Sequence, residues 1–221
     1  MSIPRLRCPE LVRRTIVERI VAGVYQPGDR LIELQLAREL GVSQAPVREA
    51  LRELEAARMV ESTPHRGTRV RVESAKEMRD AYFTRGILEE GAARGAAKAF
   101  KGKAVALRAA CEAIIAAAEA GELPEQAAAN QTFHRMIVAA AGNEVLLRLW
   151  DELAFETRTR VRLARDGAKR VADAKTHRPI VDALEKGDGR SAGKLLREHS
   201  ESFAPAEHEG TAIKLESTGA R

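Results

Sequence analysis

The pattern of apolar and polar positions predicts two short amphipathic helices close together between Gly23 and Val72. The first carries three apolar residues on one face, Leu36, Ala37 and Leu40. Gly41 is placed to end it, because glycine readily adopts the left-handed conformation at a helix C-terminus. The second has apolar residues at i, i+3, i+4 and i+7, the spacing of a buried stripe: Val47, Ala50, Leu51 and Leu54. Two such helices joined by a Gly-containing turn form a helix-turn-helix pattern.

The polar residues of the second helix lie where a nucleic acid could reach them. Ser43 is an N-cap residue type, and Pro46 falls in the first turn, where its missing N–H is no loss. Gln44, Arg48 and Arg52 lie off the apolar stripe and are expected to face outward. Spacing alone leaves two accounts open, because a helix-turn-helix also forms ordinary corners in helical domains.

A hairpin follows the second helix. Strand-like residues at Val60 and Ser62, and again at Thr68, Val70 and Val72, flank four residues that turn the chain: Pro64, His65, Arg66 and Gly67. A hairpin directly after a helix-turn-helix is typical of the wing of a winged-helix domain. Residues 1–72 also hold 13 arginines, no lysine and nine acidic residues, so the positive excess lies with this pattern. Arginine suits contacts with phosphate and guanine, although a solvated basic face would explain the same excess.

This region resembles the winged-helix domain of the GntR family of bacterial transcription regulators. The matching residues are Gly23, Tyr25, Pro27, Gly28, Leu31, Glu33, Leu36, Ala37, Leu40, Gly41, Val42, Ser43, Pro46, Val47, Arg48, Glu49, Ala50, Leu51 and Leu54. The resemblance implies DNA contacts from Ser43, Gln44, Ala45, Arg48, Arg52, His65, Arg66 and Gly67. Arg58 departs from the family pattern, which has glycine before the first strand of the wing.

The pattern changes to continuous helical periodicity after Ser74, which forms a capping-box motif with Glu77. Short breaks at glycines separate six further helical segments, expected at 75–99, 103–120, 124–141, 143–166, 168–186 and 188–204. Short connections favour antiparallel packing. The predicted fold is therefore mainly α: a winged helix-turn-helix over residues 1–73, an antiparallel all-α bundle of six or seven helices over 74–204, and a flexible tail over 205–221.

Composition narrows the class of protein. A charged content of 31% and a hydrophobic content of 44% indicate a globular chain. Cys8 and Cys111 are too few for a disulfide framework, and no segment is apolar over about 18 residues. We expect a cytoplasmic protein that does not enter a membrane.

Several polar residues fall on faces that should turn toward the interior of the bundle. Arg85 shares a stripe with apolar residues, so it should pair with a Glu or Asp of a neighbouring helix or meet an anionic ligand. His134, His177 and His199 lie in three different helical segments, and Asn130 is one turn before His134. These histidines could share a metal, or each could be an ordinary buried or surface residue.

Residues 75–204 resemble the FCD ligand-binding domain of the FadR-type branch of GntR regulators. The residues that carry the resemblance are Arg85, Leu88, Glu89, Ala92, Ala93, Asn130, Phe133, His134, Ala141, Gly142, Asn143, His177, Ile180, Gly187, Asp188, Ala192 and His199. Many members bind a divalent metal through one Asp and three His, with a small carboxylate effector nearby. The resemblance implies a metal, with Zn or Ni as candidates, at His134, His177 and His199, with Asn130 in the position of the Asp. From its place on an interior stripe, Arg85 is the residue expected to bind the effector.

The sequence thus predicts a ligand-responsive regulator that is not an enzyme. It would bind a palindromic double-stranded DNA operator as a homodimer, bind a small organic acid effector in its helical domain, and act as a repressor. The alternative is a metal-dependent hydrolase built on the helical domain, in which three histidines and an open metal position would activate water.

Overall fold

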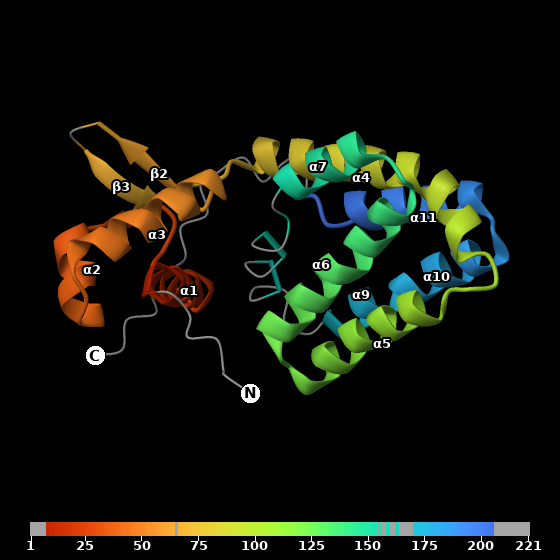
Figure 1. Cartoon of the computed structure of the whole chain (residues 1–221), viewed down its shortest axis with the longest axis horizontal. Coiled ribbons are helices and arrows are strands. Elements are labelled where there is room, and N and C mark those ends of the chain that lie inside the picture. The colour runs from red at the N-terminus through yellow and green to blue at the C-terminus, as the bar shows by residue number, and fades with distance from the viewer. Residues whose placement is uncertain are drawn as a thin grey trace. The chain divides into compact units, whose positions relative to one another are not determined.

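The computed structural model describes residues 8–64, 66–153, 155, 158–159, 162–163 and 170–205. The chain divides into two compact units between Glu73 and Ser74 (Figure 1), and each unit is described by itself. The tail expected over 205–221 lies outside the described residues after Pro205.

The N-terminal unit is a winged helix-turn-helix with a small antiparallel sheet. Its elements are α1 (Cys8–Val21), β1 (Arg30–Leu31), α2 (Glu33–Leu40), α3 (Gln44–Ala56), β2 (Val60–Thr63) and β3 (Gly67–Val70). The strand order is β1-β3-β2, and the β2–β3 hairpin is the wing (Figure 1). The sequence did not predict β1, since two residues are too few to show an alternating pattern. The second wing strand ends at Val70 rather than Val72.

The predicted apolar stripe of α3 forms the core of this unit. Val47, Ala50, Leu51 and Leu54 are buried against α1 and α2. Gly41 ends α2 in the left-handed conformation, with φ 64°, and its N–H bonds to the carbonyl of Arg38. These local signals confirm the helix-turn-helix.

Arg58 occupies a left-handed position directly after α3, with φ 56°. The Arg58 N–H bonds to the carbonyl of Glu55, and the Met59 N–H bonds to the carbonyl of Leu54. This hydrogen-bond pair is a Schellman motif, in which glycine is the favoured left-handed residue. The backbone turn typical of the family is therefore kept in this chain, with a bulkier residue in it.

The second unit is an all-helical bundle. Its described helices are α4 (Ala75–Phe100), α5 (Val105–Ala120), α6 (Leu123–Ala140), α7 (Glu144–Glu152), α9 (Arg170–Lys175), α10 (His177–Lys186) and α11 (Gly189–Glu201). The predicted capping box starts α4: the Ser74 hydroxyl accepts from the Glu77 N–H, and the Glu77 carboxylate accepts from the Ser74 N–H. Helix α11 packs along α4, where a side chain at Gly189 would come within 2.8 Å of the Arg94 Cα.

Two expected helices are shorter than predicted. The helix expected over 168–186 is interrupted at Thr176, between α9 and α10. Pro179 accounts for this break, because it cannot donate to the carbonyl four residues earlier and its ring crowds that carbonyl. The helix expected over 143–166 is interrupted at Leu153, whose N–H bonds to the carbonyl of Trp150, three residues back.

Within the described ranges, no helix combines the length and the apolar character needed to cross a bilayer.

Candidate functional site

The exposed face of α3 carries the residues predicted to contact DNA. Gln44, Ala45, Arg48 and Arg52 are all exposed. Ser43 has the extended backbone of an N-cap residue, with φ −75° and ψ 169°, but its hydroxyl makes no capping hydrogen bond. The first turn of α3 therefore leaves backbone N–H groups and a free hydroxyl toward solvent, as an anion site requires.

Arg48 is held by a neighbouring helix. Its Nη2 lies 2.9 Å and its Nε 3.1 Å from Oε2 of Glu33, at the start of α2. This pair, and the hydrogen bonds within it, raise the pKa of Arg48 above its ordinary value. The guanidinium is thus oriented while it remains exposed on the helix surface.

The wing supplies the remaining predicted contacts. Arg66 and Gly67 are exposed at the turn between β2 and β3, and Gly67 has a φ of 77°. His65 lies outside the described residues, so its predicted contact stays a prediction.

The three predicted histidines meet in the interior of the helical unit. They come from α6 (His134), the first residue of α10 (His177) and the last turn of α11 (His199), and all are buried. One ring nitrogen from each lies within 4.8 Å of the others, and the Nε2 atoms of His134 and His177 are 3.3 Å apart. Residues that are far apart in the sequence thus form one cluster.

The other nitrogen of each ring, Nδ1, faces an oxygen atom of the protein that can accept a hydrogen bond. His177 Nδ1 lies 2.8 Å from the carbonyl of Ala174. His199 Nδ1 lies 2.9 Å from the Thr176 hydroxyl, which itself donates to the carbonyl of Asp173. His134 Nδ1 lies 3.1 Å from Oε1 of Glu89, short of good hydrogen-bond geometry. These acceptors favour the tautomer with the proton on Nδ1, which leaves the three Nε2 lone pairs toward one another.

Burial keeps the three rings neutral. Burial, assisted by the proximity of the His134 ring, lowers the pKa of His177 to about 3. Burial likewise lowers the pKa of His134 and brings the pKa of His199 well below its ordinary value. Neutral imidazoles are the form that ligates a metal.

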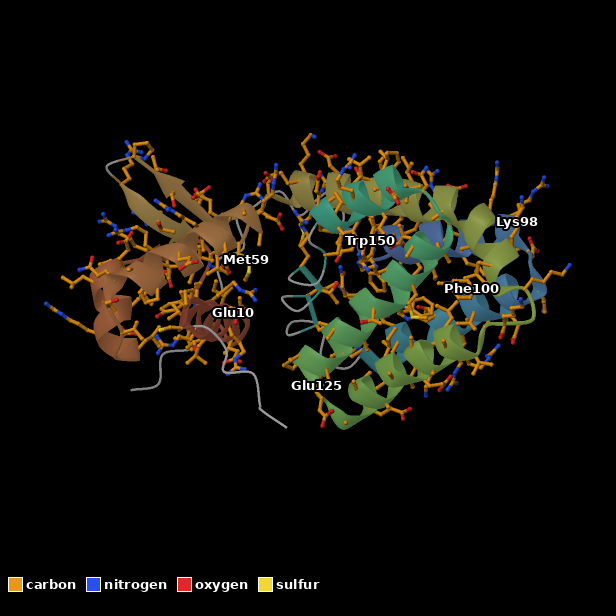
Figure 2. All side chains as sticks on the ribbon, viewed as in Figure 1. Glu10, Met59, Lys98, Phe100, Glu125 and Trp150 are labelled. Carbon is orange, nitrogen blue, oxygen red and sulfur yellow. The ribbon has the colours of Figure 1, made fainter. Side chains whose placement is uncertain are left out.

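Glu89 connects this cluster to the rest of the bundle and was not assigned a role from the sequence. Its Oε1 accepts from Arg85 Nε at 2.8 Å and from Trp150 Nε1 at 2.9 Å, and its Oε2 accepts from the Ser200 hydroxyl at 3.2 Å. Trp150 comes from α7 (Figure 2). Burial by itself would raise the pKa of Glu89, but the neighbouring Arg85 guanidinium holds it well below its usual range, so this buried carboxylate is ionised.

A sequence signal for this pair does exist. Arg85 and Glu89 are four residues apart, so they share one helix face, and the other buried residues of that helix are Tyr82, Gly86 and four alanines. Of the two accounts of Arg85 left open by the sequence, pairing with a protein carboxylate is observed, within its own helix. Its Nη2 is nevertheless buried and has no hydrogen-bond partner among the described residues.

Asn130 also reaches the cluster. Its Nδ2 lies 3.1 Å from His177 Nε2, so the amide now presents a donor there, and the opposite amide orientation would present its oxygen. Asn130 and His177 line a cavity of about 10 Å³, room for about one water molecule, together with Gln126, Thr159 and Arg162. Arg85 is not part of the lining of this cavity.

The arrangement of the donors fits a metal ion. Two imidazole nitrogens on one tetrahedral ion at 2.0–2.1 Å are separated by about 3.3 Å, which is the spacing of the His134 and His177 Nε2 atoms. Two lone pairs that face one another at that spacing repel, and a cation between them removes the repulsion. Carboxylate, carbonyl and hydroxyl groups behind ligand histidines are the usual outer partners of such sites.

The winged helix-turn-helix and the helical domain with a buried polar centre together define a DNA-binding transcription regulator. The chain belongs to the GntR family: residues 10–70 match the bacterial regulatory proteins of the gntR family, and residues 80–202 match the FCD domain.

Relatives extend over most of the chain. A protein of Paenarthrobacter nicotinovorans named as a probable D-xylose utilization operon transcriptional repressor is 42% identical over 195 residues, which are 88% of this chain and 86% of that protein. The transcriptional repressor GlaR of Escherichia coli K12 is 29% identical over 199 residues, 84% of this chain and 89% of its own. A solved GntR regulator from Rhodococcus sp. RHA1 superposes with a TM-score of 0.69 at 25% identity, covering 88% of this chain and 94% of that one. These relatives are transcriptional regulators, so the hydrolase alternative is not retained.

Proposed function

We propose that this protein is a homodimeric repressor that releases its operator when a small carboxylate binds at a metal in the helical domain. The observation that carries the proposal is the pairing of an exposed α3 surface with a buried histidine cluster in one chain. Two of its relatives are named as repressors, which supports repression.

His134, His177 and His199 would hold the metal through Nε2. Zn and Ni suit a three-imidazole site. Asn130 would complete it as a neutral and weaker ligand, with its amide turned so that oxygen faces the ion. When bound, the ion would supply positive charge and an open position for an anion. The residues of the protein would orient the rings and exclude water.

The effector would take its remaining contact from Arg85. Arg85 Nη2 is a buried donor without a hydrogen-bond partner among the described residues, and an unpaired buried donor is costly, so an acceptor from outside the protein would satisfy it. Since the cavity beside Asn130 and His177 has room for about one water molecule, an acid must open the surrounding helices to enter. This opening is the conformational change that would connect effector binding to DNA release.

A palindromic operator requires two recognition helices, so we propose a homodimer. Measurement of the solution mass at micromolar concentration, with and without DNA, tests this directly. A monomer under both conditions would contradict the proposed geometry.

The regulatory function is tested by selecting binding sites from random duplex DNA with the metal-loaded protein, then adding small mono- and dicarboxylic acids. D-xylose serves as a neutral comparator in the same assay, because a relative is named for its operon. We expect a selected palindrome and its release by an acid but not by the sugar. Release by uncharged compounds alone would refute the effector class, and failure to select any site would refute DNA binding.

A further inference from the structure

A row of charged residues crosses the outer face of the wing sheet. Arg30 of β1 lies directly opposite Arg69 of β3, and Arg69 lies directly opposite Glu61 of β2. Residues directly opposite in antiparallel strands lie on the same face. All three are exposed, whereas Leu31 and Val70, which point the other way, are buried in the core. The row therefore faces solvent.

Arg30 reaches along this face toward the turn of the wing. A side-chain carbon at Gly67 would lie 3.4 Å from both Nε and Nη2 of Arg30, so the guanidinium packs against the backbone of Gly67. A glycine there leaves this place open for Arg30. Nitrogen-tipped side chains surround the hairpin (Figure 2).

The positive charge of Arg30 is not balanced within the described part of the chain. The Arg30 side chain makes no ion pair or hydrogen bond with the described residues. Arg69, in contrast, donates from Nη1 to the carbonyl of Gly28 at 2.9 Å, and it has Glu61 on its other side. Two like charges directly opposite one another on neighbouring strands destabilise a sheet. An anion bound at Arg30 would remove that repulsion.

We propose that Arg30 is a DNA-phosphate contact, positioned by Gly67 at the wing and acting together with the exposed Arg66. This inference rests on the winged unit binding DNA, and it adds to the DNA-binding interface a residue of β1, outside the helix-turn-helix and the turn of the wing. A guanidinium fork suits a phosphate, and a phosphate contact carries no sequence preference. Arg30 should therefore contribute to affinity and to its salt dependence, and not to the choice of operator.

The test uses a duplex that the wild-type protein has selected from random DNA, with affinity measured between about 50 and 200 mM salt. In Arg30→Ala, the slope of log affinity against log salt should become less steep by about 0.9, the change expected for one lost phosphate contact. The preference for the selected site over a base-substituted site should stay as in wild type. Arg30→Lys keeps the charge and should keep the wild-type slope.

Arg14→Ala is the matched control. It removes one arginine from the same unit, but from α1, where Arg14 pairs with Glu18 in the same helix. The control should leave the slope unchanged. If Arg30→Ala keeps the wild-type slope, or if Arg14→Ala changes it as much, the proposal is wrong. If the salt slope of Arg30→Lys fell as much as that of Arg30→Ala, the proposal would also be wrong, because the positive charge at position 30 would then not be the cause of the slope. A wild-type protein that selects no duplex would instead refute DNA binding itself.

Discussion

Replacing Asn130 by Asp tests the metal centre most sharply, because it should lower the stability of the metal-free protein and at the same time enlarge the stabilisation that metal adds. Without metal, Asn130 Nδ2 lies 3.1 Å from the Nε2 of His177, where it satisfies an otherwise bare lone pair. A carboxylate of the same shape would place a second acceptor there in a buried position. Loss of a buried donor costs about 1–3 kcal/mol, so metal-free Asn130→Asp should be less stable than metal-free wild type.

The stabilisation that metal adds should instead be larger in Asn130→Asp than in wild type. Ligand binding stabilises the folded protein by about 2.7 kcal/mol when the free metal is at 100 times Kd, and by about 4.1 kcal/mol at 1,000 times Kd. A charged ligand in place of a neutral amide should tighten binding about tenfold, so at one fixed metal concentration the stabilisation should rise by about 1.4 kcal/mol. For a chain of this length, about 2–4 °C in Tm corresponds to each kcal/mol. With free metal at 100 times the wild-type Kd, the metal-induced rise in Tm should thus be about 5–11 °C in wild type. It should be about 3–6 °C larger in Asn130→Asp at the same metal concentration.

Calorimetry of chelator-treated protein, repeated at one fixed free Zn²⁺ or Ni²⁺ concentration, measures both quantities, and elemental analysis gives the metal content per chain. His177→Gln is the control: it loses the hydrogen bond to Ala174 in both states, so its metal-induced shift, rather than its absolute Tm, is the readout. We expect that shift to disappear. A wild-type protein that carries no metal when purified without chelator, and gains no stability from either ion, would refute the metal site. A metal shift in Asn130→Asp no larger than in wild type would refute the role of residue 130.

The other predictions concern single side chains. Arg48→Ala should weaken operator binding about tenfold to a hundredfold in a titration while leaving the Tm unchanged, since Arg48 is exposed. Wild-type affinity in the folded variant would show that α3 is not the recognition helix. Arg85→Lys keeps a positive charge beside Glu89 but removes the buried Nη2 donor that has no partner among the described residues. Release from DNA should then need at least about tenfold more acid. An unchanged response would rule Arg85 out as an effector contact. Arg85→Met is unsuitable for this purpose, because an unpaired buried Glu89 costs about 3–5 kcal/mol. Arg58→Gly should raise the free energy of unfolding by about 0.5–1 kcal/mol in urea denaturation, because Arg58 adopts a left-handed φ of 56° that glycine tolerates better. Arg58→Ala keeps the backbone strain and should give no such gain. Equal effects of the two substitutions would show that backbone strain at position 58 is not the cause.

Much of the fold was predictable from sequence because its signals are local. The apolar stripe of α3, the left-handed glycine at position 41 and the Ser74–Glu77 capping box each involve residues within one or two helical turns. Such signals act through backbone conformation and nearest neighbours, which tertiary packing seldom overrides when they agree. The break at Thr176 was not predicted from the sequence, although Pro179 is a signal for it, because the helical periodicity on both sides outweighed one proline.

The candidate site depended on tertiary structure. The sequence named His134, His177 and His199, but spacing could not show that α6, α10 and α11 bring them together, because side chains over 20 residues apart meet only through packing. The same packing turned each Nδ1 toward an acceptor and so directed the Nε2 atoms to one point. It also made Glu89 the common partner of Arg85, Trp150 and Ser200, and no local pattern contains those partners. Composition and periodicity decide which residues are buried, whereas the crossing of helices decides which buried polar groups can satisfy one another.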